Sequence, residues 1–128
     1  DLPEFSEAGS SKAVAECLEV PEIRHHFERP TVPFQLLREQ PIETQHEGRW
    51  ISGVIDRAVV LMEEGKASAI TIIDFKTDAK ETAESLRTKH TSQLHIYRAA
   101  LHRITGVPLD KITCYLLATE LKQMVQID

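Results

Sequence analysis

The sequence has little of what thiolate metal sites, disulfide frameworks and membrane spans require. Its two cysteines, Cys17 and Cys114, lie far apart without CxxC spacing. They cannot hold zinc or an iron–sulfur cluster by themselves, and no disulfide framework is expected. No apolar run approaches the roughly 18 residues of a membrane span, and no signal peptide is visible. We therefore expect a protein of the reducing cytoplasm, with no iron–sulfur cluster and no membrane partner.

An excess of positive charge is also absent. Fifteen lysines and arginines stand against 20 aspartates and glutamates, a formal net charge of −5. A domain that binds nucleic acid on its own is usually basic. The charge balance instead suits a catalytic domain whose carboxylates hold cations and whose substrate is delivered by another domain. The chain begins at Asp1 without an initiator methionine, so we expect a fragment of a longer protein.

What the sequence does contain is the composition and pattern of one α/β domain. Hydrophobic residues make up 41% and charged residues 27% of 128 residues, which suits a single globular core. Residue patterns predict strands at 34–43, 49–62, 69–76, 111–119 and 121–127, and helices at 12–19, 22–27 and 86–105. We expect a mixed sheet flanked by helices, in which residues 1–33 form a polar and helical N-terminal segment and residues 34–128 form the core. Phe34 and Trp50 are expected inside that core, whereas Arg57 is expected to be solvated or to face a phosphate.

Two of the predicted strands form a β-hairpin that gathers charge on an apolar face. Residues 63–66, Glu-Glu-Gly-Lys, supply the turn, and Asp56 and Asp74 are equidistant from Gly65. A hairpin that turns about this glycine makes the two carboxylates cross-strand neighbours roughly 5 Å apart. Lys76 follows Asp74 by two residues and therefore points to the same face. Burying such charges is costly unless they are paired or bind a ligand.

This arrangement of charges predicts metal-dependent chemistry on a phosphodiester. Neighbouring carboxylates repel each other unless a cation or a proton lies between them, and oxygen donors without thiolates favour Mg²⁺ or Mn²⁺ over zinc. A cation held by Asp56 and Asp74 would supply Lewis acidity and stabilise the developing charge. Lys76 would orient or deprotonate the attacking water. The alternative is a structural cluster of buried ion pairs, which contributes little stability.

The helix predicted after the hairpin carries a second polar feature. Gln93 and Tyr97 are spaced i, i+4 and share a face. That face is the apolar stripe from Leu86 to Ile104, where a glutamine is out of place. We expect the amide and the hydroxyl to reach the open end of the hairpin, where they contact a phosphate or order Lys76.

These segments resemble the RecB-like branch of the PD-(D/E)XK nucleases. The matching runs are Gly53-Val54-Ile55-Asp56-Arg57, Ile73-Asp74-Phe75-Lys76-Thr77 and Gln93-Leu94-His95-Ile96-Tyr97. The second and third runs are similar to the C-terminal nuclease domain of bacterial helicase–nucleases that process double-strand breaks. Arg38-Glu39-Gln40-Pro41 resembles the RExP strand of those proteins. The resemblance covers roughly residues 38–127 and implies a restriction-endonuclease-like αβββαβ core.

The resemblance also implies roles for individual residues. It makes Asp56, Asp74 and the backbone carbonyl of Phe75 metal ligands, Lys76 the catalytic lysine, and Gln93 and Tyr97 the catalytic QxxxY motif. The implied protein is a Mg²⁺- or Mn²⁺-dependent deoxyribonuclease, an exonuclease rather than an endonuclease, that acts on single-stranded DNA. Its implied partner is a fused or associated helicase, and its implied context is double-strand-break processing and recombinational repair. The residues themselves do not distinguish an exonuclease from an endonuclease, and they do not give the polarity of cleavage.

One departure from the family leaves other functions open. The family usually has a metal-ligating histidine on an upstream helix, whereas the helix predicted at 12–19 has none. His25 and His26 follow it in the wrong context. Either that ligand lies upstream of Asp1 or the metal site is incomplete. The alternatives are a catalytically inactive nuclease-like module that holds DNA or docks a partner, and a metal-dependent hydrolase of small phosphoesters.

Overall fold

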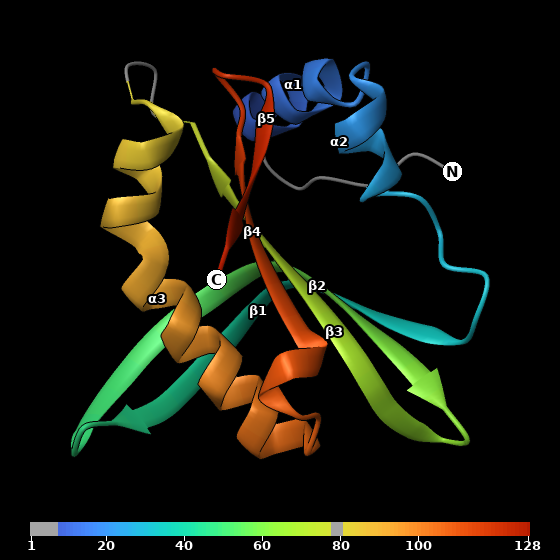
Figure 1. Ribbon diagram of the computed structural model, residues 1–128, viewed down its shortest axis with the longest axis vertical. Coiled ribbons are helices and arrows are strands. Elements are labelled where there is room, and N and C mark those ends of the chain that lie inside the picture. Colours follow the sequence, from blue (N-terminus) through green and yellow to red (C-terminus); the bar gives the residue numbers. More distant parts are fainter. Residues whose placement is uncertain (1–7, 78–80) are drawn as a thin grey trace.

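A five-stranded mixed sheet forms the centre of the molecule (Figure 1). The structure is a computed structural model that describes residues 8–77 and 81–128. The elements are α1 (Ala8–Cys17), α2 (Pro21–His25), β1 (Phe34–His46), β2 (Arg49–Glu63), β3 (Lys66–Lys76), α3 (Ala83–Thr105), a 3₁₀ turn (Leu109–Lys111), β4 (Ile112–Ala118) and β5 (Gln123–Ile127). The strand order is β1-β2-β3-β4-β5, and β3 pairs with β4 in parallel while the other pairs are antiparallel. The predicted α/β class and restriction-endonuclease-like order of elements are confirmed.

Helices cover both faces of the central strands. Helix α3 packs Leu94 and Leu101 into the larger cluster, which includes Ile72 of β3. On the other face, Ile23 of α2 joins a second cluster that includes Ile73. This double burial explains why β3 is apolar on both faces, as the sequence pattern indicates for a central strand. Each fully buried isoleucine stabilises the fold by about 1.5–3 kcal/mol.

Several element boundaries differ from the predicted ones. Helix α1 begins at Ala8 and ends at Cys17, where 12–19 was predicted, and β3 begins three residues before the predicted position 69. Strand β1 continues through Pro41 to His46. Pro41 is tolerated there because β1 is an edge strand of the sheet, so fewer of its amides need a partner. No helix of the described part of the chain is long and apolar enough to cross a membrane.

The turn between β2 and β3 is tighter than the sequence pattern predicts. Glu64 and Gly65 both have positive φ, 51° and 78°, which is the backbone of a two-residue type I′ hairpin turn. The pairing then shifts by one residue, which leaves Ser68 without a cross-strand partner. The Ser68 hydroxyl donates a hydrogen bond to the carbonyl of Leu61 across this β-bulge, at 3.2 Å.

The bulge determines which residues come together at the far end of the hairpin. A two-residue turn without a bulge would pair Asp56 with Ile73. With the extra residue in β3, Arg57 pairs with Ile73 instead, and the next positions are Asp56 and Asp74. The predicted neighbours are therefore correct, although the predicted turn about Gly65 is not the cause.

Candidate active site at the fork between β2 and β3

Strand β2 separates from β3 at Asp56, and the candidate site lies at this fork. Regular pairing of the two strands ends at Arg57 and Ile73, and the β1–β2 ribbon then diverges from β3 and β4 (Figure 1). Beyond that point the amide of Phe75 donates to Asp56 Oδ2, at 2.8 Å, in place of a β2 carbonyl. The amide and carbonyl of one residue in an extended strand point to the same side, so the Phe75 carbonyl also points into the fork.

The two predicted carboxylates meet in this fork. Asp74 is only 5% exposed. Burial, followed by the hydrogen bond and the negative charge of Asp74, raises the pKa of Asp56 to about 7. Two carboxyl groups this close in a buried site cannot both ionise easily, because each negative charge disfavours the other. The fork is therefore a place where a cation is favoured.

Lys76 occupies the mouth of the fork. Its Nζ lies 2.9 Å from Asp74 Oδ2, and its side chain is 20% exposed. This contact is an ion pair without hydrogen-bond geometry, and Asp74 Oδ2 accepts no hydrogen bond from any described residue. The Lys76 backbone carbonyl accepts hydrogen bonds from the Thr119 amide and hydroxyl, at 2.9 and 3.2 Å. Thr119 thus fixes the end of β3 that carries the lysine.

The residues of the predicted QxxxY motif also contact each other. Gln93 Nε2 donates to Tyr97 Oη at 3.0 Å, and Tyr97 is 3% exposed. Burial, and next the charge of Asp74, raises the pKa of Tyr97. The predicted stripe is wrong at two positions, because Gln93 and Ile104 are exposed. The inward face of α3 instead runs through Leu94, Tyr97 and Leu101.

Sequence reasoning missed two residues at this site. Gly53 faces Tyr97 so closely that an added Cβ would lie 2.7 Å from the Tyr97 hydroxyl oxygen. Its position at the start of the Gly53–Arg57 run was a signal that could have revealed this contact, since glycine inside a strand often marks close approach of another group. Thr119 had no comparable signal, because its role depends on the parallel pairing of β3 with β4.

Several other expected positions lie away from the fork. His25 is exposed beside Glu28, and the ring of His26 lies 4.6 Å from that of Tyr115. Neither histidine adds to the two carboxylates. Trp50, expected in the core, is 73% exposed on β2.

Arg57, which the sequence suggested as a solvated or phosphate-facing residue, is buried. Its guanidinium carbon lies 4.8 Å from the centre of the Phe27 ring. Burial lowers the pKa of Arg57 to about 10, with a smaller contribution from the charge of Arg38. The side chain therefore packs on the α1–α2 side of the sheet and does not face solvent.

The donors at the fork fit a hard divalent cation. The carboxylates of Asp56 and Asp74 and the carbonyl of Phe75 are all oxygen donors, which suit Mg²⁺ or Mn²⁺. Asp74 Oδ2 lies 2.9 Å from the Lys76 ammonium, so a divalent cation bound by Asp74 would share this carboxylate with the lysine. Nowhere in residues 8–77 and 81–128 do three or more His, Cys, Asp or Glu side chains gather to hold a metal. A cation here would therefore need ligands beyond these two side chains.

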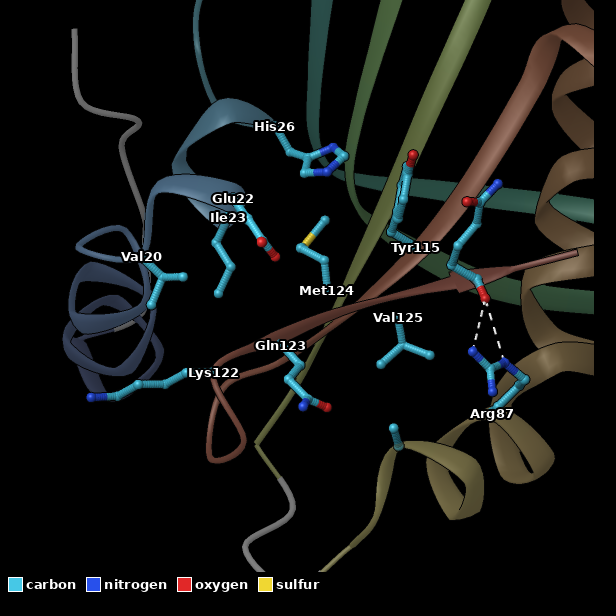
Figure 2. A pocket seen from close by; sticks show the side chains of 12 residues that line it. Val20, Glu22, Ile23, His26, Arg87, Tyr115, Lys122, Gln123, Met124 and Val125 are labelled. Carbon is cyan, nitrogen blue, oxygen red and sulfur yellow. Dashed lines mark hydrogen bonds between the residues drawn. The ribbon is translucent and has the colours of Figure 1, made fainter.

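A hollow elsewhere on the molecule is separate from the fork (Figure 2). It has a volume of about 580 Å³ and lies along β5, between α2 and the first turns of α3. Figure 2 shows Arg87 reaching toward the β5 backbone, where it approaches the carbonyl oxygen of Gln126 at 3.4–3.5 Å. None of the predicted site residues lines this hollow.

Comparison with known proteins supports the interpretation of the fork. Residues 5–126 match the PD-(D/E)XK nuclease superfamily. The chain is also 36% identical, over 81 residues, to an ATP-dependent helicase/nuclease subunit of Limosilactobacillus fermentum (strain NBRC 3956 / LMG 18251). That alignment covers 59% of this chain and 6% of the relative, so the chain spans a small part of the length of the protein it matches. The match over residues 5–126 and the mixed sheet with its carboxylate-bearing fork show that this chain belongs to the PD-(D/E)XK nuclease superfamily.

Proposed function

We propose that this chain is an active, Mg²⁺- or Mn²⁺-dependent deoxyribonuclease domain. The observation that carries the proposal is the convergence of Asp56, Asp74 and Lys76 at the fork, where the pKa of Asp56 is raised to about 7 and Lys76 Nζ lies 2.9 Å from Asp74 Oδ2. A structural ion-pair cluster would hold one cation for each carboxylate, whereas here two neighbouring carboxylates share one lysine. Membership in a nuclease superfamily supports a nucleic acid as substrate.

The side chains divide the work of phosphodiester hydrolysis between them. Asp56, Asp74 and the Phe75 carbonyl hold the cation, which supplies Lewis acidity and charge stabilisation when bound. Lys76, paired with Asp74 and partly exposed at the mouth, orients the attacking water. Gln93 is exposed, so its amide can contact a DNA phosphate.

The wider context follows from the relative in Limosilactobacillus fermentum. The name of that protein describes one subunit that combines a helicase with a nuclease. By analogy, this domain acts as an exonuclease on single-stranded DNA supplied by a fused or associated helicase. Such a protein works in the cytoplasm in double-strand-break processing and recombinational repair.

The test is cleavage of end-labelled single-stranded and double-stranded DNA by the 128-residue chain with Mg²⁺, with Mn²⁺ and with EDTA. We expect metal-dependent shortening from one end. Loss of a group that acts in the transition state costs on the order of 10²–10³-fold in rate, and we expect this for Asp74→Ala and Lys76→Ala. The matched controls are Asp110→Ala and Lys66→Ala, which change exposed residues away from the fork. Unchanged cleavage by Lys76→Ala would reject the assignment. A labelled small phosphodiester offered beside DNA separates a small-phosphoester hydrolase from a nuclease.

A second candidate, a nuclease-like module that no longer cleaves, rests on one observation. Only two acidic side chains meet at the fork, and no third His, Cys, Asp or Glu among the described residues joins them. Calorimetry with Mn²⁺ distinguishes the candidates. Binding that Asp56→Asn abolishes favours the nuclease, whereas absence of binding by the wild-type chain favours the inactive module.

A further inference from the structure

Two side chains take the place of backbone partners where β2 leaves β3. Asp56 Oδ2 accepts the Phe75 amide at 2.8 Å. On the β2 side, the hydroxyl of Tyr97 accepts a backbone hydrogen bond from Val54, an amide that pairing with β3 would otherwise satisfy. Buried amides need such partners. At the fork, each of the two strands thus has one backbone amide that is satisfied by a side chain.

The contact between Tyr97 and β2 requires a glycine. An added Cβ at Gly53 would meet Tyr97 Oη at 2.7 Å and Cε1 at 2.8 Å, distances at which a buried ring must move. Tyr97 is held from α3 by its own burial and by Gln93 Nε2, 3.0 Å from its hydroxyl oxygen. The ring therefore has little freedom to retreat from β2.

Position 53 is three residues before Asp56, in the part of β2 that no longer pairs with β3. On its other edge this segment pairs only with the edge strand β1. A small displacement of Val54 is therefore transmitted along the strand to the Asp56 carboxyl. Catalytic geometry tolerates displacements of only about 0.5 Å.

We infer that Tyr97 is a positioning residue for Asp56, and that Gly53 allows the Tyr97 ring to approach β2 because glycine has no Cβ. Tyr97 fixes β2 by accepting the Val54 amide, and β2 in turn places the Asp56 carboxyl against β3. This inference deepens the proposed nuclease function and rests on it for its catalytic meaning. Because the Tyr97 hydroxyl accepts the Val54 amide, an apolar residue that only fills the same space could not replace Tyr97.

The first test needs neither metal nor cleavage. Amide hydrogen exchange is measured by NMR on the metal-free chain, wild type and with Tyr97→Phe or Gly53→Ala. Tyr97→Phe keeps the ring but loses the acceptor. Because a hydrogen bond of about 1.4 kcal/mol corresponds to a factor of ten, we expect the Val54 and Phe75 amides to exchange about tenfold faster. The Ile70 amide in the paired part of β3 is the internal reference, and Val54→Ile, which adds a methyl on an exposed side chain, is the matched control.

The second test separates positioning from packing. Tyr97→Phe is expected to weaken Mn²⁺ binding and lower kcat about tenfold while leaving KM for DNA unchanged, on the scale of one hydrogen bond. In a Tyr97→Leu background, Gly53→Ala is expected to reduce Mn²⁺ binding and kcat much less than it does in the wild type, because the aromatic ring that the added Cβ would strike is absent.

The outcomes are separable from failure of the proposed function. If Gly53→Ala does not fold, Tyr97→Phe decides alone. Unchanged exchange at Val54 and Phe75 in Tyr97→Phe, or acceleration equal to that at Ile70, overturns the inference. If Tyr97→Phe accelerates exchange as expected but the wild-type chain does not cleave DNA, the nuclease function is rejected. Tyr97 then remains the residue that positions Asp56.

Discussion

At the scale of single residues, the perturbed carboxyl of Asp56 distinguishes the fork from the apolar core around it. Its carboxyl accepts the Phe75 amide, which favours the ionised form, yet burial and Asp74 outweigh that contact and raise its pKa to about 7. A carboxyl group held in this state binds a proton or a cation near neutral pH. Perturbed acids of this kind are typical of functional sites.

The raised pKa predicts an unusual pH dependence for the metal-free chain. Because the folded pKa of about 7 exceeds the ordinary value of 3.8, the folded state binds more protons between these values. The stabilising contribution is present below about pH 4 and is lost as pH rises through 7. Asp56→Asn removes this ionisation, so its melting temperature relative to wild type should increase between pH 4 and pH 8 in EDTA.

Calorimetric melting at pH 4, 6 and 8 checks this expectation, with the exposed Asp110→Asn as control. A difference between Asp56→Asn and wild type that stays constant with pH would contradict it. The comparison is made without metal because a bound cation would stabilise the ionised form.

At the scale of secondary-structure elements, the register of one hairpin decides whether the site exists. The two-residue turn and the bulge at Ser68 act together to place Asp56 beside Asp74. A slip of one residue moves side chains to the opposite face of a strand. The bulge is therefore as necessary for the site as the acidic residues themselves.

Insertion of one alanine after Ile70 is expected to destabilise the chain far more than a change at Ser68. Ser68→Ala removes one hydrogen bond and should cost about 0.5–1.5 kcal/mol. The insertion lies in the paired part of β3, so it forces Ile72 and Ile73 to exchange faces or the strand to form a second bulge, and should cost about 3 kcal/mol or more. Urea unfolding followed by circular dichroism measures both. Equal losses for the two variants would show that the register of β3 is not fixed by its pairing with β2.

At the scale of the whole molecule, the N-terminal helices and the sheet form one packed unit. Val14, Cys17 and Ile23 belong to the same buried cluster as Ile73 and Leu117. Arg57 also packs there, against Phe27. The face of β3 opposite the candidate site is therefore covered by the segment before residue 34.

Ile23→Ala tests this dependence. The isoleucine is almost fully buried in α2, so its truncation should lower the free energy of unfolding by about 2–5 kcal/mol in a single cooperative transition. Val32→Ala, at a position 47% exposed, should change it by less than about 0.5 kcal/mol. Urea unfolding measures both variants. A separate early transition in Ile23→Ala, with the sheet unaffected, would show that the helices fold apart from it.

The sequence by itself determined the class of fold and the convergence of charged residues at the fork. The continuous apolar run of β3 and the helical spacing of α3 are local properties, so they predicted a central strand and a core-facing helix. The spacing of Asp56, Asp74 and Lys76 reflects strand geometry, which has a fixed period of two, so their convergence could be predicted. Gln93 and Tyr97 shared a face for a similar reason.

Only the tertiary structure decided how those residues are held. The bulge at Ser68, the approach of Tyr97 to Gly53 and the anchoring of Lys76 by Thr119 arise between segments far apart in the chain. Local patterns carry no information on such contacts, which is also why exposed Trp50 and buried Arg57 were misplaced. Sequence periodicity fixes which way a side chain points along its own element, whereas packing between elements decides what it meets.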